Sequence, residues 1–263
     1  MLPQKYFIER IAGDRFDVNV MIPEAASPAT YEPTAKQMRE LSKSLLYMKI
    51  GYIGFELGWM KKLRDINPVM KITDMSEGIE LIRGHFHGQY EADENSTGSV
   101  DPHIWVSPRS SIIIARNIYE TLCELDPGHK EEFKNNYDTF ISELHELDYW
   151  ITDKISSARS NKFLIFHPAL TYYARDYGLE QISIEKEGKS PSIAHLSRII
   201  DQAGSESIRD VFIQAEFDWK NAESVARELD GKVIRINPLD YNWKKQIIEI
   251  TEKMTMVLND TCL

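Results

Sequence analysis

The chain has 263 residues, of which 42% are hydrophobic, 27% charged and 10% aromatic. This composition is typical of a globular protein and excludes a disordered, collagen-like or coiled-coil chain. The formal net charge of −10 disfavours binding to nucleic acid or to an anionic membrane surface, because both partners need a basic footprint.

Short apolar runs bounded by Gly, Pro, Asn or Asp alternate along the chain with longer segments of helical periodicity. This alternation predicts an α/β fold with parallel sheets flanked by helices. The predicted strands are residues 18–22, 46–50, 162–166, 181–184, 211–214 and 232–236. The predicted helices, apart from one long central helix, are residues 6–11, 107–124, 169–177, 192–203 and 219–229.

The central helix is predicted from a single apolar stripe with steps of three and four residues. The stripe consists of Phe133, Tyr137, Phe140, Ile141, Leu144, Leu147, Ile151 and Ile155. Asp126 followed by Pro127 is typical of a helix start. A helix over residues 127–158 spans about 45 Å, longer than a crossover helix needs to be. We therefore expect it to join an N-terminal α/β lobe, residues 1–126, to a C-terminal α/β lobe, residues 159–263; the alternative is a surface helix of a single domain.

Three polar residues stand where α/β folds place ligand-binding groups, after a strand or turn and before a helix. They are His103, His167 and Asp240. Each also has a structural interpretation, since a strand-end histidine can bond to the backbone and an aspartate can cap a helix. Two imidazoles and one carboxylate suit zinc or, with more oxygen ligands, manganese. The histidines in or beside predicted helices favour surface or core roles: His129, His145 and His195.

Other kinds of site find less support in the sequence. Cys123 and Cys262 are far apart and show no CxxC spacing, so neither a disulfide framework nor a cysteine zinc site is expected. There is no glycine-rich loop of the spacing that binds nucleotides or phosphate. There is also no run of about 20 apolar residues that could cross a membrane.

A family resemblance rests on several strings that occur in a fixed order over nearly the whole chain. They are LPQKYFIERIAGDRFDVNVMIP, SPATYEP, GYIGFE, DPHIWVSP, IFHPALTYYARDYGL, EGKSPS and VFIQAEFD. Together they resemble the metal-ion class of solute-binding proteins of ABC importers. The resemblance implies two α/β lobes joined by a long rigid helix, with zinc or manganese held between the lobes. It further implies a monomeric binding protein, not an enzyme, that delivers its ion to a membrane ABC permease.

The resemblance also implies the ligands. His103 matches the second histidine of the family, His167 matches the third ligand, and Asp240 stands where the C-terminal lobe supplies a carboxylate. The chain departs from the family at the first ligand, where Ala29 replaces a histidine two residues before the triplet Tyr31-Glu32-Pro33. An alanine side chain cannot bind a metal.

Three consequences of Ala29 are open. The site can hold zinc with three protein ligands and water, or with a substitute donor such as His85 or His87. Alternatively, the protein keeps its fold but has lost tight metal binding. The third alternative is a zinc hydrolase, because three ligands plus water is the usual catalytic arrangement, with Glu32 or Glu216 as the base.

The segment 84–99 is acidic and polar and contains His85 and His87. We expect a loop, which either collects zinc loosely, as the resemblance suggests, or is simply solvated. Family members are normally exported and carry an export signal and a first strand ahead of the string LPQKYF. The resemblance thus implies a periplasmic location or a lipid anchor at the cell surface. We expect no signal peptide within the sequence itself, because Met1 to Lys5 leads directly into the mature domain.

Overall fold

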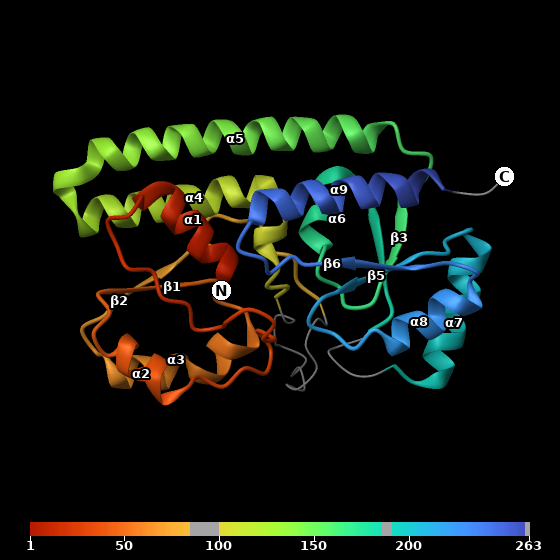
Figure 1. Ribbon diagram of the computed structural model, residues 1–263, viewed down its shortest axis with the longest axis horizontal. Helices are drawn as coiled ribbons and strands as arrows, with labels where there is room; N and C mark the ends of the chain where they lie inside the picture. Colours follow the sequence, from red (N-terminus) through yellow and green to blue (C-terminus); the bar gives the residue numbers. More distant parts are fainter. Residues whose placement is uncertain (85–99, 186–190, 261–263) are drawn as a thin grey trace. The chain divides into compact units, whose positions relative to one another are not determined.

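The computed structural model describes residues 1–84, 100–185 and 191–260 (Figure 1). Its packing divides the chain into two compact units, each assembled from separate stretches of sequence. Unit 1 comprises Met1–Glu80, Pro108–Glu146 and Leu239–Trp243, and unit 2 comprises Leu81–Ser107, Leu147–Pro238 and Lys244–Leu263.

Unit 1 contains a two-stranded parallel sheet, in which β1 pairs with β2 from Leu46↔Lys71 to Lys49↔Asp74. Its elements are α1 (Leu2–Ala12), α2 (Ala35–Leu41), β1 (Leu46–Lys49), α3 (Gly54–Ile66), β2 (Lys71–Asp74), α4 (Pro108–Leu125) and the short 3₁₀ helix η2 (Pro127–His129). A capping box starts α2: the hydroxyl of Thr34 accepts a hydrogen bond from the backbone N–H of Gln37. At the other end of β1, the buried carboxylate of Glu56 accepts hydrogen bonds from the backbone N–H groups of Ile50 and Gly51 and thereby fixes the turn into α3.

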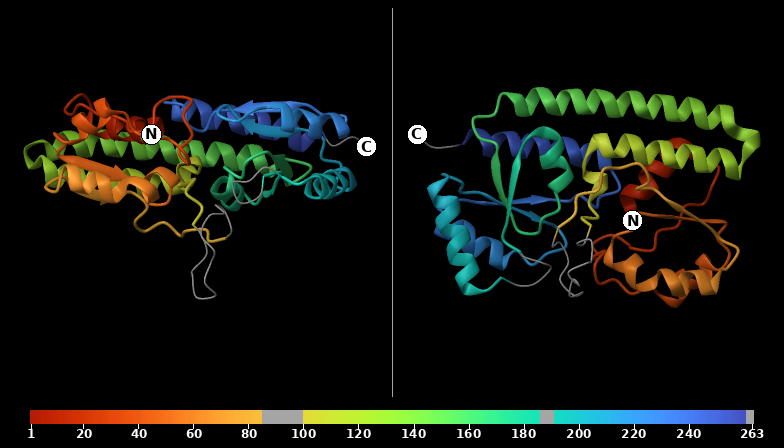
Figure 2. Two further views of the ribbon diagram at one scale, coloured as in Figure 1. Left: turned by 90° about the horizontal axis from the view of Figure 1, so that it is seen from below. Right: turned by 180° about the vertical axis from the view of Figure 1, so that it is seen from behind.

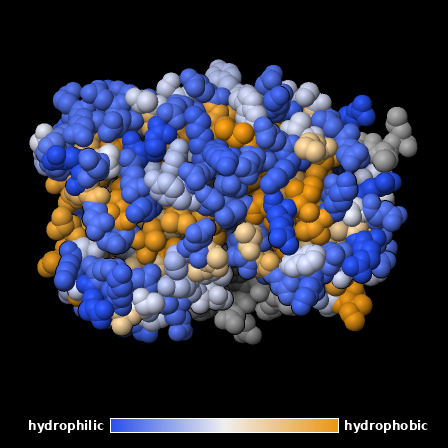
Figure 3. Space-filling model, viewed as in Figure 1, coloured by the Kyte–Doolittle hydropathy of each residue, from blue (hydrophilic) through white to orange (hydrophobic). Residues whose placement is uncertain are grey.

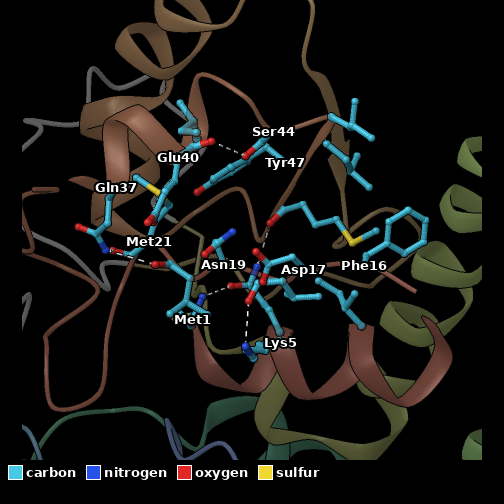
Figure 4. A pocket seen from close by; sticks show the side chains of 18 of the residues that line it. Met1, Lys5, Phe16, Asp17, Asn19, Met21, Gln37, Glu40, Ser44 and Tyr47 are labelled. Atoms are coloured by element: carbon cyan, nitrogen blue, oxygen red, sulfur yellow. Dashed lines mark hydrogen bonds between the residues drawn. The ribbon is translucent and has the colours of Figure 1, made fainter. Parts of the chain in front are cut away.

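The predicted strand at residues 18–22 is wrong, because this segment has no strand pairing in the structure. Its carbonyl groups accept hydrogen bonds from side chains: Lys5 donates to Val18, and Gln37 donates to Val20 and Met21. A cavity of about 440 Å³ lies between this segment and β1 and has a mixed polar and apolar lining (Figure 4). Side-chain donors thus take the place of a backbone ladder.

Two glycines of α3 give a matched pair of predictions. A methyl group on Gly54 would lie 2.6 Å from the carbonyl oxygen of Ala29, whereas one on Gly58 would meet no atom within 4 Å. We expect Gly54→Ala to destabilise the fold by about 1–3 kcal/mol, because backbone must move. Gly58→Ala should stabilise it by roughly 0.5–1 kcal/mol, since alanine is the better helix former. Urea unfolding of both variants is the measurement, and equal shifts of the same sign would contradict this account.

Unit 2 contains a four-stranded parallel sheet in the order β4-β3-β5-β6. Its strands are β3 (Lys162–Ile165), β4 (Glu180–Ser183), β5 (Val211–Gln214) and β6 (Val233–Ile236). Its helices are η1 (Ile104–Val106), α6 (Thr171–Tyr177), α7 (Ile193–Ser205), α8 (Lys220–Glu228) and most of α9 (Trp243–Asn259). Leu164, Val211 and Ile213 form a buried cluster with apolar residues of α7 and α8, which lie next to each other (Figure 1).

The long central helix is present as α5 (Lys130–Ser156), which follows directly on η2. It has 27 residues, a length of about 40 Å, and is unbroken in both views of Figure 2. Phe133, Phe140 and Ile151 of the predicted stripe are fully buried. Asp126 does not cap the helix through its side chain; its carboxylate bonds instead to Nδ1 of His129, at 2.7 Å. The helix begins in unit 1 and ends in unit 2, with the boundary between Glu146 and Leu147.

The packing units differ from the predicted boundaries 1–126, 127–158 and 159–263 chiefly in the stretch Leu81–Ser107, which belongs to unit 2. Hydrogen bonds explain this membership. The hydroxyl of Tyr172 accepts from the N–H of Ile82 and donates to the carbonyl of Asp101. The indole N–H of Trp105 donates to the carbonyl of Pro238 at 2.9 Å. His103 therefore lies in the same unit as His167.

Hydrophilic side chains cover most of the face seen in Figure 3, in keeping with the charge of the chain. In the part of the chain that the structure describes, no helix combines the length and the apolarity needed to cross a membrane.

Candidate metal centre

The centre of the candidate site is a pair of imidazoles in unit 2. His103 precedes η1, and His167 follows β3 by two residues. Their Nε2 atoms lie 3.4 Å apart, and their rings meet edge to face with centroids 5.2 Å apart. Both side chains are largely buried, with exposures of 12% and 11%. The structure thus brings together two of the three predicted site residues.

Each imidazole is held at its other nitrogen by a buried carboxylate. Nδ1 of His103 lies 2.8 Å from Oδ1 of Asp101, and Nδ1 of His167 lies 2.5 Å from Oε2 of Glu185. A carboxylate offers only acceptors, so the hydrogen in each contact belongs to Nδ1. In the neutral form of such a ring, with its one hydrogen on Nδ1, Nε2 carries a lone pair.

The distance between the two Nε2 atoms matches a shared ion better than a direct hydrogen bond. A hydrogen bond between nitrogens at 3.4 Å is long compared with the usual donor–acceptor distances of about 2.7–3.2 Å. Two nitrogens bound to one tetrahedral zinc at about 2.0–2.1 Å are separated by about 3.3–3.4 Å. Facing lone pairs at this separation are suited to binding a divalent cation.

The carboxylate beside His103 is ionised. Burial by itself raises the pKa of Asp101, but the electrostatic attraction of His103 and its two hydrogen bonds to this carboxylate outweigh that effect and bring the pKa below its ordinary value. Asp101 is completely buried and accepts from the backbone N–H of His103 as well as from the ring, both at 2.8 Å. This compact turn fixes both the backbone and the side chain of His103.

The ring of His167 is fixed from further sides. The Phe217 ring stacks on it with centroids 4.9 Å apart and an interplanar angle of 26°. The side-chain amide of Gln214, at the end of β5, donates to the backbone carbonyl of His167 at 2.7 Å. Glu216 lies between Gln214 and Phe217 in the chain. Burial raises the pKa of its carboxyl group, and a hydrogen bond to its own backbone and the electrostatic attraction of His167 partly offset this rise.

The other predicted residues belong to unit 1 or lie outside the described residues. Asp240 belongs to unit 1, where it is half-buried and its Oδ1 accepts from the backbone N–H of Asn242 at 2.7 Å. Its role as a ligand stays a prediction. Ala29 is exposed in unit 1. His85 and His87 lie outside the described residues, and within residues 1–84, 100–185 and 191–260 no group of three or more His, Cys, Asp or Glu side chains is arranged to hold an ion.

The sequence analysis missed the two carboxylates that orient the imidazoles. The signal for Asp101 was its position two residues before His103, typical of a tight turn in which an aspartate bonds to its neighbours. The signal for Glu185 was the register of β3 and β4. Ile165 pairs with Ser183, so two further residues along both strands place His167 beside Glu185.

Comparison with known proteins identifies the family of the chain. A family model described as zinc-uptake complex component A, periplasmic, matches residues 1–260. The zinc-binding protein AdcA of Streptococcus pyogenes serotype M3 is 28% identical over 265 residues, which cover 93% of this chain and 50% of AdcA. The high-affinity zinc uptake system protein ZnuA of Bacillus subtilis is 26% identical over 244 residues, which cover 90% of this chain and 76% of that protein. The chain thus spans about half the length of AdcA.

Among solved structures, a zinc-bound ZnuA with residues 138–173 of its own chain deleted superposes with a TM-score of 0.90. It is 34% identical, and the match covers 100% of this chain and 97% of the other. The predicted fold class, α/β with parallel sheets flanked by helices and one long connecting helix, is confirmed. The chain belongs to the ZnuA family, the periplasmic component A of zinc-uptake complexes.

Proposed function

We propose that the protein is an extracytoplasmic solute-binding protein that captures zinc and delivers it to an ABC permease. His103 and His167 are the two imidazole ligands, and Asp240 adds a carboxylate. The proposal rests on one observation above all: two Nε2 atoms 3.4 Å apart, each on a ring whose Nδ1 faces a buried carboxylate. The names of the relatives, zinc-binding protein and high-affinity zinc uptake system protein, support zinc as the solute.

The donor chemistry favours zinc over manganese. Imidazole nitrogens suit zinc, whereas manganese prefers carboxylate, carbonyl and water oxygens. Zinc also binds more tightly than manganese at a given nitrogen and oxygen site. A site built around two imidazoles should therefore discriminate against manganese, although it can accept manganese when zinc is scarce.

The two alternatives fare differently. The hydrolase is set aside, because members of this family are solute-binding proteins rather than enzymes. A family member that has lost tight binding stays a distinct outcome of the test, since Ala29 stands where the resemblance implies a histidine.

The test is a zinc titration of the metal-stripped protein at neutral pH, by calorimetry with a competing chelator, followed by elemental analysis of the saturated protein. We expect one zinc ion per chain and a weaker response to manganese. Absence of saturable zinc binding by the folded protein would instead support loss of the solute site.

Restoring the absent histidine gives a further prediction. We expect Ala29→His to tighten zinc binding by about tenfold or more, because a fourth protein ligand replaces water in the tetrahedral shell. The matched control is Thr30→His, the exposed neighbouring position, which should leave the affinity unchanged. Competition titrations of both variants measure the effect, and equal affinities for the two would contradict the assignment of position 29.

A further inference from the structure

Two carboxylates orient the imidazole pair, and they do so in different ways. Asp101 is two residues from His103 and bonds to both its backbone and its ring. Glu185 is 18 residues from His167 and reaches the ring from the segment that directly follows β4. The backbone N–H of Glu185 donates to the carbonyl of Phe166 at 2.8 Å, which extends the β3–β4 ladder up to His167.

We infer that Glu185 is a positioning residue for zinc capture: by accepting a hydrogen bond from Nδ1–H of His167, it keeps Nε2 unprotonated and directed at Nε2 of His103. This inference rests on the proposed function. A neutral imidazole can carry its hydrogen on either nitrogen, and only the form with the hydrogen on Nδ1 offers Nε2 to a metal. Without Glu185 the two forms compete, and a part of the molecules presents an N–H to the incoming ion.

The contact should also strengthen the bond that His167 makes. A carboxylate on the far nitrogen makes an imidazole a better electron donor, and loss of such partners in metal sites costs about 10–100-fold in affinity. Glu185 is 8% exposed, so water screens this contact little. Phe217 and Gln214 hold the ring plane and the backbone of His167, but the structure shows neither of them contacting Nδ1. Of these three residues, Glu185 is therefore the one placed to favour the Nδ1–H tautomer.

The experiment measures zinc affinity and the tautomer of His167 in the full chain. Competition titrations give the affinity, and long-range ¹H–¹⁵N spectra of the metal-stripped protein show which ring nitrogen carries the hydrogen. We expect Glu185→Ala to weaken zinc binding about 10–100-fold and to shift His167 away from the Nδ1–H form. Glu185→Gln, which keeps an acceptor oxygen but no charge, should recover part of the affinity and retain the Nδ1–H form.

The control is Glu180→Ala, at the start of the strand β4 that leads to Glu185; the Glu180 side chain is 52% exposed and pairs with Lys162. Its zinc affinity should equal that of the unmodified chain. Unchanged affinity in Glu185→Ala, together with lost affinity in His167→Ala, would overturn the role of Glu185 and leave the zinc site standing. Unchanged affinity in His167→Ala would refute the proposed site itself. Weakened binding with an unchanged tautomer would also overturn the inference, because Glu185 would then act only through the fold.

Discussion

Replacing His167 with alanine is expected to weaken zinc binding by more than ~100-fold. Loss of a residue that only orients a metal ligand costs about 10–100-fold in affinity, and this substitution removes the ligand itself. The change also leaves Glu185 buried without the ring that it contacts. Of the proposed ligands, only His103 and Asp240 then remain, too few to hold the ion tightly. The measurement is a competition titration of the metal-stripped variant.

A second histidine provides the control for this variant. His195 lies near the start of α7, and its Nε2 contacts the carbonyl of Ile184 at 3.1 Å rather than the imidazole pair. We expect His195→Ala to bind zinc as the unmodified chain does. If the two variants bind zinc equally, the pair formed by His103 and His167 is not the site of capture.

The second large effect concerns the stability of unit 2. Phe212 is fully buried in β5 and packs edge to face against Phe163, with centroids 5.9 Å apart. We expect Phe212→Ala to lower the free energy of unfolding by about 3–5 kcal/mol, through lost burial and the cavity that remains. Phe212→Leu should cost less, since leucine refills most of the volume. Urea unfolding monitored by circular dichroism measures both, and equal losses would contradict a packing effect.

The sequence predicted several elements whose periodicity is strong. The stripe of α5 and the strand at 211–214 are clear cases, since the first has eight apolar side chains in phase and the second coincides with β5. The helix α9 was missed although its buried residues follow helical spacing, whereas two other missed elements, α3 and β2, carry mixed signals. Gly54 and Gly58 interrupt the helical pattern of α3 with two residues of low helix propensity. In β2, Ile72 is the only apolar residue beside Lys71, Thr73 and Asp74.

The wrong strand at 18–22 has a different cause. Its pattern suits a strand, but the side chains of Lys5 and Gln37 donate hydrogen bonds to its carbonyl groups. The local sequence does not show whether such a segment will pair with a strand or with side chains. The same limit applies to the site. Position after a strand or turn and before a helix was enough to select His103 and His167 as candidates. The contact between His167 and Glu185 needed the register of two strands, which is a property of the assembled sheet.

That register sets which insertions and deletions the protein can tolerate. His167 meets Glu185 because both strands continue in phase past Ile165 and Ser183. One residue added inside β4 would turn the carboxylate to the opposite face of the sheet and bring an apolar neighbour, Ile184, into its place. One residue added at the turn before Glu180 could be absorbed outside the ladder. Length variation among natural or engineered descendants of this chain should therefore accumulate ahead of β4 and be excluded from the five residues that follow Glu180.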